Sequence, residues 1–237
     1  MIDFGLLMSI IVAVVAPTLL QRWWTVRTLR DGATAIDALV VPAGAGVIVG
    51  RLTTLAIDDP RSVGSVSDML VIRSGVEFWP AVAVAALLVA WSGRRDRVNP
   101  LTRVADLAPF AMVGYGAYEM ACLFRDGCYG PASALGIKPD GLTTSMVPVG
   151  VLMGLGVVAG AAAIRRVNET GWPPGAVAAA AVALVATVRS LGSIWLPKVG
   201  DAMTRQHRTS IAVFILAATA CTAELALARS RPERVSA

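Results

Sequence analysis

Seven apolar segments dominate the chain, and each is close to the length of about 20 residues that a helix needs to cross a bilayer. They are residues 4–21, 38–57, 76–92, 101–124, 143–164, 174–192 and 210–228. Only 16% of the residues are charged, whereas a soluble domain carries about 25%. The sequence therefore predicts an all-α membrane protein, a bundle of about seven transmembrane helices that forms a single transmembrane domain over residues 1–237.

The remaining composition excludes several classes of protein. The net charge is +5, but the basic residues are scattered between apolar segments, so we expect no nucleic-acid partner. The three cysteines and the single histidine lack the spacing of metal ligands, so we expect no metal site. Because the sequence contains no glycine-rich nucleotide-binding motif, we expect no cofactor.

The distribution of basic residues predicts the orientation of the bundle. Arginines cluster after the first, third, fifth and seventh apolar segments, whereas the basic residues of the other side are spread over longer loops. The clustered arginines are Arg22, Arg27, Arg30, Arg94, Arg95, Arg97, Arg165, Arg166, Arg229, Arg231 and Arg234. Since basic residues concentrate on the cytoplasmic side, we expect the N-terminus outside and the C-terminus in the cytoplasm.

This orientation places four charged residues at a similar depth in the outer half of the bundle: Arg51, Glu77, Glu119 and Arg189. Ionisable groups at membrane depth are costly and usually functional. Two interpretations stay open. In the first, the arginines and glutamates form two structural ion pairs, either Arg51–Glu77 and Arg189–Glu119 or the opposite pairing. In the second, the four side chains line one outward-opening cavity. Such a cavity would suit an anionic headgroup, because guanidinium groups bind phosphate well.

Residues 111–132 bring charged groups, cysteines and turn residues together at the end of the fourth apolar segment. The helix must end there, because Gly130 and Pro131 interrupt it. Cys122 and Cys128 allow three interpretations: free buried thiols, a disulfide on the oxidising outer side, or a catalytic thiolate. In the second segment, Gly46 and Gly50 form a GxxxG motif that predicts a close helix–helix contact.

Six stretches match, in order, the motifs of one protein family. Phe4–Met8 corresponds to YGLM, Gly46–Leu52 to GxxxGARL and Arg73–Pro80 to a stretch similar to RGGLSFHGG. Further matches are Cys122–Gly130 with the signature loop, Arg189 with the arginine of the sixth helix, and Gln206 with Ser210 in GxTxGQxxS. The chain thus resembles the bacterial prolipoprotein diacylglyceryl transferases, and more closely their divergent relatives with a GCCYG-type motif.

The resemblance implies a reaction. The family transfers a diacylglyceryl group from phosphatidylglycerol to the thiol of a lipoprotein signal-peptide cysteine. Such chemistry needs a base for the thiol and cations for the departing phosphate. By the resemblance, Arg51, Arg189, Gly130 and Trp79 occupy substrate-binding positions. Trp79 stands where the family has its histidine, so the usual base is missing, and we expect Glu77 or Glu119 to replace it as the catalytic base.

Other positions also depart from the family pattern and predict a degraded catalytic site. The family tyrosine is Phe4, the signature arginine is Glu119, the asparagine after it is Cys122, and the glutamate after the sixth-helix arginine is Ser193. Three interpretations follow. The chain transfers diacylglyceryl groups from phospholipid to lipoprotein precursors, it uses another lipid or acceptor, or it is a non-catalytic lipid-binding protein or accessory subunit of a membrane complex. In each case we expect a multi-pass protein of the bacterial plasma membrane.

Overall fold

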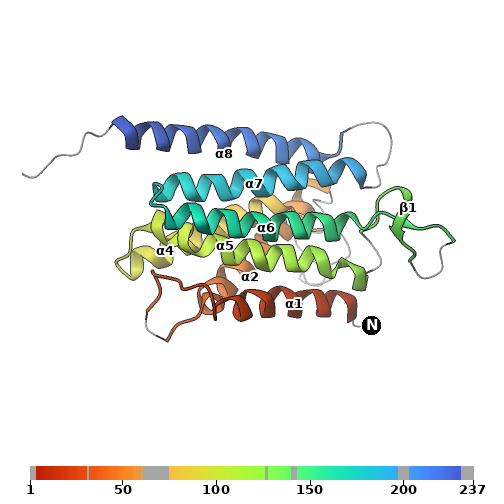
Figure 1. The fold of residues 1–237 in the computed structure, drawn as a ribbon, viewed down its shortest axis with the longest axis horizontal. Coiled ribbons are helices and arrows are strands. Elements are labelled where there is room, and N and C mark those ends of the chain that lie inside the picture. Colours follow the sequence, from red (N-terminus) through yellow and green to blue (C-terminus); the bar gives the residue numbers. More distant parts are fainter. Residues whose placement is uncertain are drawn as a thin grey trace, which may run out of the picture. The chain divides into compact units, whose positions relative to one another are not determined.

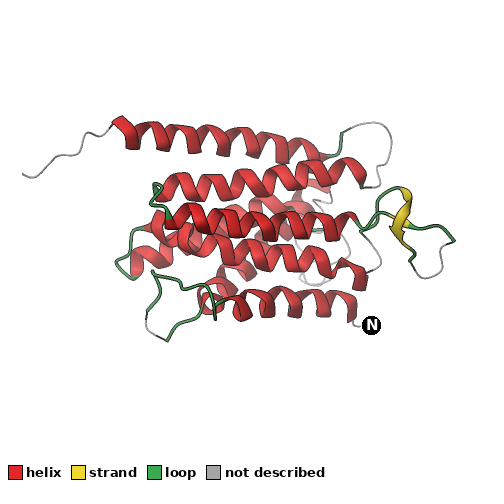
Figure 2. Cartoon of the chain, in the orientation of Figure 1, coloured by secondary structure: helices red, strands yellow, loops and turns green. Residues whose placement is uncertain are grey.

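The computed structural model describes residues 4–30, 32–58, 60, 75–125, 128–139, 143–196 and 203–230, and most of them are helical (Figure 2). The elements are α1 (Phe4–Leu20), α2 (Ala35–Asp58), α4 (Phe78–Arg95), α5 (Pro100–Met120), the 3₁₀ helix η2 (Ala121–Arg125), β1 (Ala132–Ile137), α6 (Val149–Glu169), α7 (Pro174–Trp195) and α8 (Arg205–Ser230). The prediction of a helical fold is confirmed for most of the described residues, and β1 is a short strand that the all-α prediction did not include.

Among the described residues, five helical segments are long and apolar enough to cross a membrane: α2, α5 together with η2, α6, α7 and α8. α1 is apolar but has only 17 residues. These helices indicate a multi-pass membrane protein. The count of seven spans and the orientation stay predictions.

Each predicted segment overlaps one observed α-helix, and the largest difference in bounds is at the start of α6. We expected a helix from residue 143, but α6 begins at Val149. The preceding residues pair with the segment around β1: Ser133 N–H donates to the Ser145 carbonyl (2.9 Å), and Val147 N–H donates to the Pro131 carbonyl (3.0 Å). Pro148 directly precedes α6, and a proline disfavours helical geometry in the residue before it.

The start of α2 illustrates how local sequence fixes a helix boundary. Thr34 N–H donates to the Asp37 carboxylate (2.8 Å), and Asp37 N–H donates to the Thr34 hydroxyl (3.2 Å). This reciprocal pair satisfies two backbone groups that the first turn would otherwise leave without partners. The boundary therefore follows from two side chains three positions apart.

The chain divides into two compact units, and each is described by itself. Unit 1 comprises Met1–Thr25 and Ala105–Ala237, and unit 2 comprises Val26–Val104. The single domain predicted from the sequence stays a prediction. Within unit 1, the start of α1, β1, the end of α7 and the start of α8 lie at the same end (Figure 1). We call this end of unit 1 the β1 end.

In unit 1, close backbone approach joins α5 to α6. A Cβ atom at Gly116 would lie 2.8 Å from the Gly154 carbonyl oxygen, and a Cβ at Gly154 would meet the Gly116 carbonyl oxygen. Helices in lipid gain cohesion from such small-residue contacts. α7 packs against both α6 and α8, whereas only 6% of the apolar window of α8 is buried. Most of α8 therefore faces the surroundings of unit 1.

In unit 2, the GxxxG motif of α2 packs against α4. A Cβ at Gly46 would lie 2.5 Å from the Ala81 carbonyl oxygen, and a Cβ at Gly50 would lie 2.6 Å from the Glu77 carbonyl oxygen. The predicted role of this motif as a helix contact is confirmed.

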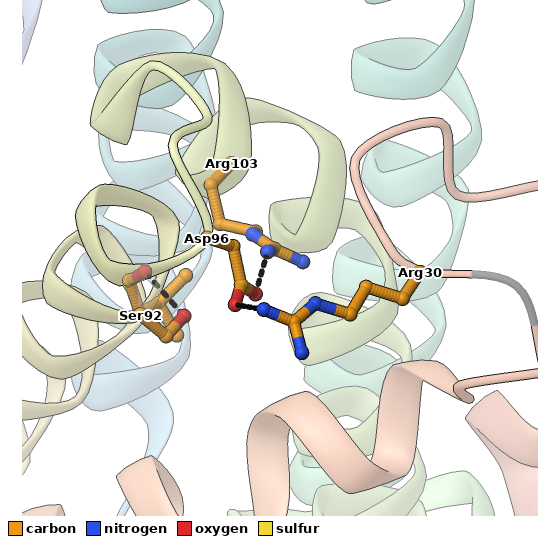
Figure 3. A network of polar contacts seen from close by, with 5 residues as sticks. Arg30, Ser92, Asp96 and Arg103 are labelled. Carbon is orange, nitrogen blue, oxygen red and sulfur yellow. Dashed lines mark hydrogen bonds and ion pairs between the residues drawn. The ribbon is translucent and has the colours of Figure 1, made fainter.

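An ion-pair network joins the end of α4 to the start of α5 in unit 2 (Figure 3). Arg103 is 1% exposed and donates to the Asp96 carboxylate at 2.5 Å. The other oxygen of Asp96 pairs with the exposed Arg30 at 2.9 Å. Because a buried guanidinium needs a counter-charge, Asp96 is what makes the burial of Arg103 tolerable. Arg103, which stands near the start of a predicted span, was not among the charged residues predicted to matter from the sequence.

Replacing Gly46 by alanine should destabilise the α2–α4 contact, because the new methyl group would collide with the backbone of Ala81. We expect Gly46→Ala to lower the free energy of unfolding in detergent micelles by about 1–3 kcal/mol. Gly44→Ala is the matched control, since a Cβ there meets nothing within 4 Å. It should leave stability unchanged or raise it by up to about 1 kcal/mol through helix propensity. Equal losses in both variants would contradict the observed packing.

Candidate functional site

A cluster of three polar side chains joins α5 to α7 within unit 1. Arg189 of α7 is 8% exposed. Its Nη1 donates to the Tyr115 hydroxyl and lies 3.6 Å from Oε1 of Glu119. Tyr115 and Glu119 are four residues apart on α5 and therefore share one helix face. The structure thus brings together Arg189 and Glu119, one of the pairings that the sequence allowed.

Tyr115 links the two charged groups chemically. Its hydroxyl accepts a hydrogen bond from Arg189 and also interacts with the Glu119 carboxylate. A phenol can accept one hydrogen bond and donate another, so it can serve both partners at once. The guanidinium also lies 5.6 Å from the centroid of the Tyr115 ring, within range of a cation–π attraction. The result is a charge-balanced cluster, the Arg189 cluster, made of Tyr115, Glu119 and Arg189.

Tyr115 was not among the site residues predicted from the sequence. The available signal was its position one turn before Glu119 on the same predicted helix. Its partnership with Arg189 depends on how α5 packs against α7, which no local pattern reveals.

A second polar cluster joins α7 to α8 at the β1 end. Ser193 is 3% exposed, and its Oγ lies 2.7 Å from Nδ1 of His207. The same Oγ donates to the Ser190 carbonyl (2.7 Å), which also lies 3.1 Å from His207 Nδ1. Ser193 is four residues after Arg189 on α7, so the two buried side chains share one face. His207 was considered only as a metal ligand in the sequence, and its pairing with Ser193 was missed.

Cys122 and Cys128 form a disulfide, with their Cα atoms 5.8 Å apart. Of the three interpretations that the sequence left open, the structure therefore contains the disulfide. Both residues are buried, and the bond packs against the start of α6, where a Cβ at Gly150 would lie 3.1 Å from the Cys128 sulfur. Interpreting the two residues as free thiols or as a catalytic thiolate is wrong for this structure. Cys221 of α8 is free.

Arg125, which lies between the two bonded cysteines, is held by Tyr118. Its guanidinium donates to the Tyr118 hydroxyl (2.5 Å) and carbonyl (3.1 Å) and lies 4.0 Å from the ring centroid. These contacts fold the side chain back onto the end of α5. Arg125 therefore helps to fix the conformation of η2 relative to the end of α5.

Gly130 occupies a tightly packed position in unit 1. Its N–H donates to the Val147 carbonyl at 2.8 Å. A Cβ there would lie 2.5 Å from the Val149 side chain and 3.0 Å from the Trp195 carbonyl oxygen. Close packing alone accounts for a glycine at this position. Its role in substrate binding stays a prediction.

The other predicted site residues, Arg51, Glu77 and Trp79, belong to unit 2. Arg51 is 6% exposed, and its Nη1 donates to the Gly75 carbonyl at 3.5 Å. Glu77 precedes α4, and its N–H is shared between the Gly50 carbonyl (3.1 Å) and the Thr54 hydroxyl (3.0 Å). Backbone and side-chain contacts from α2 therefore hold the residue that directly precedes α4 in place.

Trp79 packs edge-on against Phe78, with the ring centroids 4.9 Å apart. Because Glu119, Gly130 and Arg189 belong to unit 1, the expected single centre of four charges stays a prediction. Arg73, which the sequence placed in a family motif, lies outside the described residues, as do Arg231 and Arg234 of the basic tail.

No protein-family model matches the chain, and no curated protein shows significant similarity to it. Within the part of the chain that the structure describes, no group of three or more His, Cys, Asp or Glu side chains could hold a metal ion. Function therefore has to be argued from the site itself.

The disulfide predicts the outcome of thiol counting. The chain has 3 cysteines, of which only Cys221 is free. We therefore expect a maleimide to modify one cysteine in the unfolded, unreduced protein and three after reduction, as counted by intact mass. In the Cys221→Ser control the unreduced protein should take up no label. Three labels without reduction would contradict the disulfide.

The Arg189–Glu119 contact should appear as an energetic coupling. In a double-mutant cycle, Arg189→Gln and Glu119→Gln together should destabilise less than the sum of the single variants, by roughly 0.5–3 kcal/mol. Each single variant leaves the other charge poorly compensated inside the unit. Reversible unfolding in bicelles measures all three variants.

The pair Arg165–Glu169 of α6 is a suitable reference, since its atoms are closer (2.8 Å) but Glu169 is 44% exposed. Its coupling should reach only about 0.3–0.5 kcal/mol. A coupling at Arg189–Glu119 no larger than this would show that burial does not strengthen the contact, and would contradict the prediction.

Proposed function

We propose that the chain is a seven-span protein of a bacterial plasma membrane that binds the headgroup of an anionic phospholipid, such as phosphatidylglycerol. In this proposal it transfers the diacylglyceryl group to the thiol of a lipoprotein precursor. The observation that carries the proposal is the buried Arg189, which α7 places against Tyr115 and Glu119 of α5. Phosphate suits such a site, because its oxygens match the planar donors of a guanidinium.

The proposed orientation has the N-terminus outside and the C-terminus in the cytoplasm. The basic residues between the segments favour it. The Cys122–Cys128 disulfide at the corner between η2 and α6 supports it independently, because structural disulfides persist in oxidising compartments and are rare in the cytosol. The β1 end of unit 1, and with it the end of α7, then lies on the outer side.

The geometry of the Arg189 cluster is compatible with exchange of one anion for another. The distance of 3.6 Å between Arg189 Nη1 and Glu119 Oε1 exceeds the roughly 2.7–2.9 Å of a charge-assisted hydrogen bond. Glu119 thus neutralises the guanidinium without a short hydrogen bond at this contact. A phosphate that offers two oxygens can compete with it for Arg189. Gly130 of the same unit is a further contact in this proposal, and the substrate-binding roles of Arg51 and Trp79 in unit 2 stay predictions.

One observation favours a second candidate, a non-catalytic lipid-binding protein or accessory subunit of a membrane complex. Arg189 already has compensation from Tyr115 and Glu119, so the cluster is also a sufficient reason for its own burial. The family positions that hold Phe4, Trp79 and Ser193 here also lack the groups that would act on substrate.

Lipid retention tests the binding step. Native mass spectrometry of protein from nanodiscs should show bound phosphatidylglycerol on the wild type. The double variant Arg189→Gln/Glu119→Gln, which removes both charges together, should retain at least about tenfold less, the equivalent of one charge-assisted contact of roughly 1.5 kcal/mol. Arg208→Gln is the control, because Arg208 is an exposed arginine near the start of α8. Equal retention by all three proteins would rule out a headgroup site at Arg189.

The transfer step needs a separate measurement. Wild-type protein in phosphatidylglycerol nanodiscs, incubated with a lipobox peptide, should add a diacylglyceryl mass to the cysteine of the peptide. Retained lipid without product would favour the non-catalytic candidate. Product only with another phospholipid or acceptor would assign the alternative transferase specificity.

A further inference from the structure

His207 is the single histidine of the chain, and its two contacts at Nδ1 favour one tautomer. Nδ1 lies 3.1 Å from the Ser190 carbonyl oxygen. A carbonyl oxygen can only accept, so a hydrogen bond there requires the proton on Nδ1. The Ser193 hydroxyl, 2.7 Å from Nδ1, is compatible because it donates to the same carbonyl and presents a lone pair to the ring. In the neutral ring, Nε2 therefore carries the free electron pair.

This arrangement argues against Ser193 as a nucleophile activated by His207. Activation would require the serine proton to move to Nδ1, which is already protonated in this tautomer. The serine and the carbonyl instead fix the ring and leave Nε2 as its basic atom. No described residue forms a hydrogen bond to Nε2.

α7 connects this ring to the Arg189 cluster. Arg189 and Ser193 are one turn apart on the same face, or about 6 Å along the helix axis. Both side chains are buried, and Ser193 contacts His207 directly. The start of α8 thus holds an imidazole one turn beyond the guanidinium, toward the β1 end. A base beside an anion-binding group is the pair that thiol attack on a phospholipid needs.

We infer that His207 is the general base of the proposed transfer, accepting on Nε2 the proton of the acceptor thiol. This inference rests on the proposed function. The thiol electron pair forms the new C–S bond to the glyceryl carbon, and the C–O bond to phosphate breaks. The bonding pair leaves on the phosphate oxygen, whose charge Arg189 offsets. The imidazolium then passes its proton to the departing phosphate or to water.

His207→Asn is the decisive variant, because the asparagine amide can replace the Nδ1–H donor but offers no base at the position of Nε2. In the peptide assay with phosphatidylglycerol nanodiscs, kcat should fall about 10²- to 10⁴-fold with little change in KM and an unchanged unfolding temperature. Added imidazole should partly restore the activity of His207→Ala, which a purely structural histidine would not allow. Arg208→Gln should behave like the wild type.

A wild-type rate in His207→Asn would overturn the inference while the proposed function stands. Absence of product from the wild type would overturn the transfer reaction and this role of His207 together.

Chemical modification adds a readout that does not depend on activity. Diethyl pyrocarbonate should modify the single histidine, and nanodiscs of phosphatidylglycerol should slow this reaction relative to nanodiscs of a zwitterionic phospholipid. Equal rates in both lipids, in protein that still retains phosphatidylglycerol through Arg189, would place His207 away from the bound headgroup and overturn the inference.

Discussion

The cost of holding a guanidinium among apolar helices governs the structure of unit 1. Arg189 would destabilise the fold if α7 buried it alone, and α5 compensates by presenting Tyr115 and Glu119 on one face. The helices that supply this compensation must stay in register, because a shift of one residue would turn a partner away. The packing register of α5 against α7 is therefore also what keeps the charge of Arg189 compensated. The close contact of Gly116 with Gly154, on the same stretch of α5, holds that helix to α6.

In unit 2 a buried arginine is also compensated by an acidic residue, Asp96, but this residue serves a structural network. Asp96 contacts the buried Arg103 at 2.5 Å and the exposed Arg30 at 2.9 Å. Because its shortest contact is a close hydrogen bond and the network lies at the turn between α4 and α5, we interpret it as structural. The longer Arg189–Glu119 contact in unit 1 is the looser of the two, which is why we place ligand exchange there.

Much of the fold, but little of the site, could be predicted from the sequence. The apolar segments predicted the helices because burial in lipid imposes length and composition directly. The start of α6 was misplaced, since pairing between Ser145 and Ser133 overrode the apolar pattern. Glu119 and Arg189 were found as charges in apolar runs. Tyr115 and His207 were missed, because an uncharged ring in a helix gains meaning only when a second helix brings its partner.

The redox conditions under which a sample is prepared determine whether the disulfide at the η2–α6 corner is present. A bond of this kind typically contributes about 2–4 kcal/mol, and here it rests directly against the backbone of Gly150. Protein purified with a thiol reductant and protein purified without one are therefore different molecules at this corner. Production in cells with an oxidising pathway outside the cytosol, and reductant-free buffers, would preserve the form described here.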